Sequence, residues 1–145
     1  AALTRSFLIA IISIGVFSLI VEMPISNILF IFIFGFLSAF ILGSLGFITG
    51  LWAEKFDHTA TVTNFVITPL SFLSGVFYSI DKLPNFFQTI SHINPFFYMI
   101  DGFRYGFLGK SDGSINIGLI YLTILSIIMW YVAFFLYKKG YKIKS

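Results

Sequence analysis

Four long apolar stretches limit what this chain can fold into. The second stretch, 28–51, would span about 36 Å as a helix, which exceeds the roughly 30 Å hydrocarbon core of a bilayer. Lipid offers no partners for backbone N–H and C=O groups, so a stretch that crosses it must be helical. We therefore predict an all-α fold, a polytopic membrane helical bundle with four transmembrane helices. The predicted transmembrane helices are 6–21, 28–51, 62–80 and 115–137.

The composition supports a membrane protein and narrows its chemistry. Of the 145 residues, 58% are hydrophobic and only 10% are charged, whereas soluble domains carry about 25% charged residues. The chain has no cysteine, which excludes disulfides and thiolate metal sites. Its two histidines, His58 and His92, are far apart and have no ligand-like neighbours, so we expect no metal site. We also expect no nucleic-acid partner for a chain of this membrane-protein composition.

The distribution of basic residues predicts the topology. Four spans place both ends on one side, which then holds six of the nine basic residues; the outer side holds Lys82, Arg104 and Lys110. Positive charge marks the cytoplasmic side of a membrane protein. We therefore expect both ends in the cytoplasm and segment 81–112 on the outer side. The chain begins "AALTRS" without Met, and we expect this start to lie inside a longer protein.

Small and polar residues recur at helical spacing on two of the predicted spans. Gly35, Ala39 and Gly43 form a small-residue stripe on span 28–51, which suits packing within the chain or contact with a second copy. On span 62–80 the stripe is polar and can either bond to other helices or line a solute path. It consists of Thr61, Asn64, Thr68, Ser71 and Gly75. Pro69 lacks an N–H and should kink this helix near Phe65.

The outer segment is predicted to contain two short helices, 84–92 and 95–108. Asn94 and Pro95 are typical of a helix start and Gly109 of a helix end. At about 14 Å and 21 Å the helices are too short to cross, yet they carry eight aromatic residues. We predict a re-entrant or interfacial helix pair that packs on span 62–80 near Phe72 as an outer lid, although a packing cap without a gating role is the alternative. The predicted lid residues are Pro84, Phe87, Asn94, Pro95, Phe97, Asp101 and Arg104, with the last two forming an ion pair.

Segment 63–109 reads "TNFVITPLSFLSGVFYSIDKLPNFFQTISHINPFFYMIDGFRYGFLG". It resembles the signature region of the type-2 ABC exporter permeases, with "TPLSFLSGVFY", an "LP" turn, "NP", and an acidic residue three before an arginine. The subgroup with this form includes multidrug and nodulation lipo-oligosaccharide exporters. The family has six membrane helices, so the resemblance implies that residues 1–145 are the C-terminal part of such a transmembrane domain.

The resemblance also implies partners and site residues. A separate ATP-binding subunit would hold ATP and Mg, this chain would bind no cofactor and have no catalytic residues, and a second permease copy would complete a homodimer in the lipid bilayer. The residues expected to contact the ATPase are Glu54, Lys55, Phe56 and Asp57. The residues expected to line the path are Asn64, Phe65, Thr68, Ser71 and Phe72.

The function indicated by this reasoning is a permease subunit of the inner (plasma) membrane. It would belong to an ATP-driven exporter that moves an amphipathic, drug-like, lipid-linked or glycan substrate out of the cytoplasm. A membrane-embedded lipid-modifying enzyme is one alternative, with His92 as base and Asp81 or Asp101 nearby. A secondary transporter is the other, but the predicted spans contain no charged residue that would mark an ion path.

Overall fold

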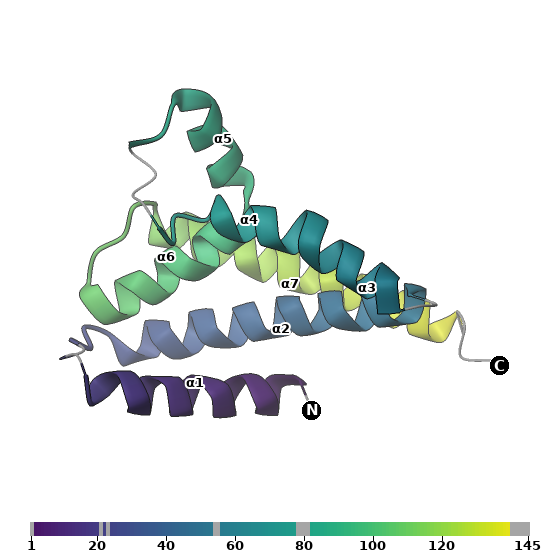
Figure 1. Cartoon of the computed structure of the whole chain (residues 1–145), viewed down its shortest axis with the longest axis horizontal. Coiled ribbons are helices and arrows are strands. Elements are labelled where there is room, and N and C mark those ends of the chain that lie inside the picture. The colour runs from purple at the N-terminus through teal and green to yellow at the C-terminus, as the bar shows by residue number, and fades with distance from the viewer. Residues whose placement is uncertain (1, 21, 23, 54–55, 78–81, 140–145) are drawn as a thin grey trace.

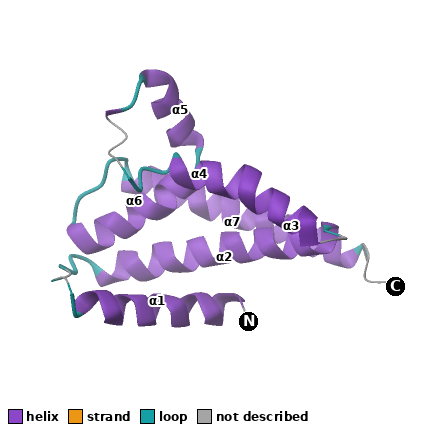
Figure 2. Ribbon diagram, viewed as in Figure 1, coloured by secondary structure: helices purple, strands orange, loops and turns teal. Residues whose placement is uncertain are grey.

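The computed structural model describes residues 2–20, 22, 24–53, 56–77 and 82–139, and over these residues it contains helices and loops but no strands (Figures 1 and 2). The predicted all-α class is therefore confirmed. Two of the helices, α2 and α7, are long and apolar enough to cross a membrane, while α1 is shorter. The elements are α1 (Ala2–Ser18), α2 (Ile28–Trp52), α3 (Phe56–Val62), the π-helix η1 (Thr63–Ile67), α4 (Thr68–Phe72), α5 (Asn85–Ile93), α6 (Pro95–Leu108) and α7 (Ile115–Lys138).

The ends of the helices follow from local chemistry. Asn27 caps α2, because its side chain accepts a hydrogen bond from the Leu29 N–H. Asn94 caps α6 in the same way, at 3.0 Å from the Phe96 nitrogen. Gly109 ends α6 with φ +68°, a left-handed conformation that glycine adopts without strain. The predicted start and end of the second outer helix are thus confirmed.

The helix at the predicted third span, 62–80, has other ends than those predicted from the sequence. The helix begins at Phe56, runs through α3, η1 and α4, and ends at Phe72, which gives it a length of about 26 Å. It ends there because the chain turns through Gly75, whose φ is +78°. Residues 78–80 lie outside the described part of the chain.

The disturbance expected near Phe65 is a π-helical turn. Pro69 has no N–H to donate, and the Thr68 N–H just before it bonds to the Thr63 carbonyl, five residues back. The Thr68 hydroxyl donates to the same carbonyl at 2.9 Å. The wider turn therefore keeps the backbone bonded where a proline would otherwise interrupt the helix.

The core lies where α2, α6 and α7 meet, with α1 on the other side of α2 (Figure 1). The buried side chains are Phe34 and Ile41 of α2, Phe97, Tyr98 and Met99 of α6, and Leu122 of α7. The aromatic faces of the outer segment were expected to pack on the third span near Phe72. Phe97 and Tyr98 instead belong to this core, because α6 lies against α2 and α7.

Two glycines allow α6 to lie this close to α2. A Cβ atom at Gly102 would overlap the ring of Phe34, and one at Gly106 would come within 2.5 Å of Ile31 Cγ1. Gly106 also bonds to the start of α2, where its carbonyl accepts the N–H groups of Ser26 at 3.1 Å and Asn27 at 2.8 Å. Helix α6 is therefore joined to α2 both by close packing at these glycines and by backbone hydrogen bonds.

Gly102→Ala tests this close approach. The added methyl group has no room, so we expect a loss of about 1–3 kcal/mol in the free energy of unfolding, as for other overpacked sites. The control is Gly50→Ala, because a Cβ atom there meets nothing within 4 Å. Unfolding of both variants can be followed in detergent by circular dichroism. A Gly102→Ala protein as stable as the parent would contradict the observed packing.

Candidate functional site

Charged and polar groups gather where the ends of α4, α6 and the loop before α7 meet. Arg104 NH1 lies 2.5 Å from Asp112 Oδ2, and its NH2 group donates to the Gly75 carbonyl at 2.7 Å. The predicted pair with Asp101 exists, but it is longer, at 3.9 Å. Arg104 therefore joins three segments of the chain, and the sequence-predicted pair is its weaker contact.

Asp101 organises the loop between α6 and α7. This carboxylate is buried and accepts the backbone N–H groups of Asp112 at 2.7 Å and Gly113 at 3.1 Å. Burial raises the pKa of Asp101, whereas the two N–H donors and Arg104 act in the opposite direction. A Cβ atom at Gly113 would lie 3.0 Å from the Phe97 ring, so a larger residue there would require the ring to shift by a few tenths of an ångström.

The part played by Asp112 was missed by sequence reasoning. Asp112 follows Arg104 by eight residues, beyond the reach of the three- and four-residue spacings that identify pairs on one helix. The sequence "KSDGS" at 110–114 is typical of a turn. A turn directly after a helix that ends in Gly109 returns the chain toward that helix, and this was the available signal.

Asn94 connects the outer segment to the end of α4. Its Oδ1 atom caps α6, while its Nδ2 group donates to the Leu70 carbonyl at 2.6 Å. The side chain is 2% exposed, so both bonds are shielded from solvent. Asn94 and Arg104 thus satisfy two carbonyl groups at and just beyond the C-terminal end of α4, where a helix runs out of intrahelical donors.

The remaining predicted lid residues separate into two groups. Pro84 precedes α5, and Phe87 is 42% exposed with its ring edge-on to Phe86. Figure 1 shows α5 standing away from α2 and α7. Phe97, two residues after Pro95 in α6, is 1% exposed and lies in the core. The structure therefore places α6 as a packed helix and α5 as an exposed one, and their role as a lid stays a prediction.

The predicted path-lining residues lie along one helix that the described chain leaves largely uncovered. Asn64, Phe65, Thr68 and Phe72 are exposed, with Phe65 at 78%, and Ser71 is half-buried. The Thr61, Thr68 and Ser71 hydroxyls donate to carbonyls of their own helix, at 2.8, 2.9 and 2.8 Å. This surface therefore presents methyl groups, aromatic rings and the Asn64 amide.

Of the residues predicted to contact the ATPase, Glu54 and Lys55 lie outside the described residues. Phe56 begins α3, and Asp57 is exposed in its first turn. An acidic residue in that position is favoured by the partial positive charge of the helix N-terminus. The predicted loop is thus partly helical, which places Asp57 on the same helix as the polar stripe.

A double-mutant cycle tests the polar network. We expect Arg104→Gln and Asp112→Asn to be coupled by more than about 1 kcal/mol of unfolding free energy, because the pair is short and largely shielded. The matched cycle uses Arg104→Gln with Asp101→Asn, whose 3.9 Å separation predicts a smaller coupling. A larger coupling in the second cycle would contradict the geometry described above.

Comparison with known proteins identifies the family. A family model described as ABC-2 type transporter matches residues 1–108. The inner membrane transport permease YadH of Escherichia coli K12 is 39% identical over 109 residues, which cover 75% of this chain and 43% of YadH. Nodulation protein J of Sinorhizobium fredii is 27% identical over 97 residues, which cover 67% and 37% of the two chains. Nodulation protein J of Rhizobium leguminosarum bv. viciae is 33% identical over 84 residues, covering 57% and 32%.

The matched region spans less than half the length of each of these relatives. No solved structure matches the chain. The family model nevertheless covers most of the sequence, from α1 to the end of α6. The chain therefore belongs to the ABC-2 type transporter family.

Proposed function

We propose that this protein is the membrane-spanning permease subunit of an ATP-driven ABC exporter in the bacterial inner membrane. The observation that carries the proposal is the family match over residues 1–108. The name of the relative YadH, an inner membrane transport permease, supports both the location and the activity. The proposed cargo is an amphipathic, drug-like, lipid-linked or glycan molecule that leaves the cytoplasm.

The proposed topology has four spans: α1, α2, the continuous α3–η1–α4 helix, and α7. The start of α3 and the C-terminal ends of α2 and α7 lie at one end of the molecule (Figure 1). Lys138 and Lys139 are at this end, which supports its assignment to the cytoplasm. Both ends of the chain would then be cytoplasmic, and α5 and the loop after α6 would lie toward the outside.

In this topology α6 is a re-entrant helix. Gly102 lies against Phe34 and Gly106 against Ile31, so α6 runs beside the first half of α2, antiparallel to it. That half of α2 would occupy the outer part of the bilayer. The backbone of α6 is bonded internally and its sides are covered by α2 and α7, which is the condition under which a helix can enter a membrane and return.

The exposed surface of the α3–η1–α4 helix is proposed to line the solute path. Its hydroxyl groups are already bonded to their own backbone, so the wall offers aromatic and methyl surface with one amide, from Asn64. Such a wall suits an amphipathic solute better than a small ion. A second copy of the chain is proposed to face the first as a homodimer and to enclose this surface.

The ATP-binding subunit is proposed to dock at the start of α3, against segment 54–57. ATP and Mg would bind to that partner and not to this chain. A continuous helix leads from the docking segment through Asp57 to the proposed path-lining residues. Movement of the partner would therefore be transmitted along a single helix, with the π-helical turn as the place where that helix can bend.

Reconstitution of the full-length protein with its ATP-binding subunit tests the function. We expect amphipathic compounds to stimulate ATP hydrolysis and to be moved across the membrane only when ATP is supplied. Phe56→Asp should reduce transport several-fold while insertion is normal, whereas Thr59→Asp on the same helix should not. Transport driven by an ion gradient without ATP would identify a secondary transporter instead.

Single cysteines test the topology independently of transport. The structure favours Ser111→Cys for the outer side, because Ser111 is exposed and lies beside the polar network, whereas Asp112 is part of it. We expect a membrane-impermeant thiol reagent to label Ser111→Cys in intact cells and Asp57→Cys only after the membrane is opened. Labelling of both sites in intact cells would refute the four-span arrangement.

A further inference from the structure

The C-terminal end of α7 carries a surface hollow of about 490 Å³. Its lining residues recur at the three- and four-residue spacing that places side chains on one face of a helix. They are Tyr131, Phe134, Phe135, Lys138 and Lys139, the last of which is the C-cap of α7. All five are exposed, so the described chain leaves this face open. The hollow is therefore aromatic along most of its length and cationic at the end of the helix.

Contacts with neighbouring side chains fix the two phenylalanine rings of the hollow. The Phe134 ring stacks on Trp130, with 5.7 Å between the ring centroids. The Lys139 ammonium lies 4.8 Å from the centroid of the Phe135 ring, which is a cation–π contact. The lysine side chain therefore lies back along the aromatic face instead of extending away from the helix end. The cationic group and the rings form one continuous surface.

The depth of these groups matches the boundary between hydrocarbon and lipid headgroups. The 24 residues of α7 span about 36 Å, about 6 Å more than the hydrocarbon core. A centred helix extends about 3 Å beyond the core at each end, which places Lys138 just outside the core. Phe135 lies about 4.5 Å further back along the helix axis, just inside the core. In the proposed topology this is the cytoplasmic boundary of the membrane.

The two lysines form no ion pair with any residue that the structure describes. Asp57 lies at the same end of the molecule, but its helix α3 packs on α2 and not on α7 (Figure 1). The C-terminus of a helix carries about half an elementary negative charge, which offsets only about a quarter of the two ammonium charges. The sequence adds two lysines at 142 and 144. Clusters of four or more basic residues directly cytoplasmic of a transmembrane helix attract anionic lipids.

We propose that this hollow binds an anionic phospholipid of the cytoplasmic leaflet. The phosphate group would bind Lys138 and Lys139. The glycerol backbone and the first part of one acyl chain would lie against the rings of Phe134, Phe135 and Tyr131. The inference rests on the topology given under the proposed function, and it is independent of which solute is exported.

Charge and depth together favour a lipid over other occupants. An acidic surface of the ATP-binding subunit could approach the lysines, but the rings beside them lie at apolar depth, where a soluble subunit does not reach. In a homodimer with its axis along the membrane normal, the same face of a second α7 would bring its lysines against those of the first. A zwitterionic lipid carries a cationic group beside its phosphate, which weakens its attraction to two ammonium groups.

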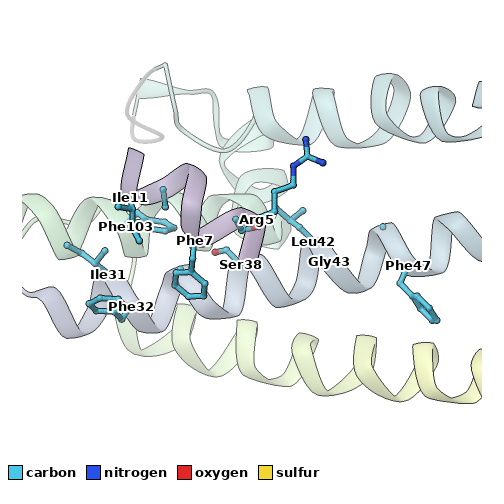
Figure 3. A pocket seen from close by; sticks show the side chains of 15 residues that line it. Arg5, Phe7, Ile11, Ile31, Phe32, Ser38, Leu42, Gly43, Phe47 and Phe103 are labelled. Carbon is cyan, nitrogen blue, oxygen red and sulfur yellow. The ribbon is translucent and has the colours of Figure 1, made fainter. Parts of the chain in front are cut away.

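The larger groove between α1 and α2, of about 740 Å³, does not share this arrangement. Its lining includes the small-residue stripe of α2 and one charged residue, Arg5. Figure 3 shows Arg5 near Leu42 and Gly43, which are about 14 Å from the Trp52 end of α2. Arg5 is therefore too deep in the proposed topology to meet a headgroup at the cytoplasmic boundary. Only the α7 hollow combines cationic groups at headgroup depth with an aromatic wall among the described residues that line these two sites.

Photo-crosslinking of the full-length protein in phosphatidylcholine nanodiscs tests the proposal. The nanodiscs contain a trace of phosphatidylglycerol with a diazirine near the carbonyl end of one acyl chain, and phosphatidylcholine with the same diazirine is the comparison. We expect phosphatidylglycerol to label segment 130–139 several-fold more than phosphatidylcholine does. Lys138→Gln combined with Lys139→Gln should abolish this preference. The matched control is Lys82→Gln combined with Lys110→Gln, which removes two exposed lysines from the proposed outer side and should leave the preference unchanged.

A second pair of variants separates a bound lipid from a general accumulation of anionic lipid near basic charge. Phe135→Ala removes one ring from the hollow and should lower phosphatidylglycerol labelling several-fold. Ile124→Ala removes exposed apolar surface from the same face of α7, about 16 Å along the helix from Phe135, and should not lower it.

Three results would overturn the proposal: equal labelling of segment 130–139 by both lipids, a preference that survives the loss of both lysines, or equal effects of Phe135→Ala and Ile124→Ala. Labelling of the middle of α7, around Ile124 and Ile127, reports insertion separately. A labelled middle without the phosphatidylglycerol preference at the end would refute the lipid site alone. A middle that neither lipid labels would refute the membrane placement of the chain, and with it both the proposed function and the lipid site.

Discussion

The close approach of α6 to α2 is the contact on which the rest of the structure depends. Gly102 and Gly106 leave room for Phe34 and Ile31, and the Gly106 carbonyl accepts the backbone N–H groups at the start of α2. With α6 fixed in this way, its other side can present Asp101 and Arg104 to the following loop and to Gly75. The short aromatic helix α6 is thereby part of the core. Its polar side chains bond to the turn after α4 and to the loop before α7.

This arrangement connects the core of the molecule to the segment that is proposed to contact the ATPase. The α3–η1–α4 helix is bonded to the core at its outer end through Leu70 and Gly75. Its inner end begins at Phe56, where the partner ATPase is proposed to dock. Between the two ends lies the π-helical turn before Pro69, at the level of the proposed path-lining residues. In the proposed mechanism, movement at the N-terminal end would bend the helix at this turn, because the C-terminal end is bonded to the core.

Local chemistry in the sequence predicted much of the fold. Asn94, Pro95 and Gly109 determine the ends of α6 within a few residues, and uninterrupted apolar sequence predicts α2 and α7. The end of the third span could not be predicted in the same way. Its apolar run continues to Ile80, but the helix stops at Phe72 because Gly75 adopts a left-handed conformation and Arg104, 29 residues away, bonds to its carbonyl. Contacts between such distant residues leave no periodic pattern in a single sequence.

The same reasoning explains which parts of the candidate site were missed. Asp101 and Arg104 are three residues apart on one helix, so their pairing was predictable. Asp112 lies in the turn after α6, and its contact with Arg104 forms only because the loop returns to that helix. The burial of Phe97 could not be predicted from the sequence, because a short aromatic helix has the same composition at a membrane surface and in a core. The glycines at 102 and 106 distinguish these cases, because they leave room for α2 to pack against α6.

Hydrogen exchange of the full-length protein in nanodiscs tests the central claim that α6 is a core helix and α5 an exposed one. The account predicts that backbone amides from Tyr98 to Gly106 exchange as slowly as those in the middle of α2, while amides of α5 exchange much faster. Fast exchange throughout both outer helices would show that α6 is a loosely attached surface element, and would contradict the account.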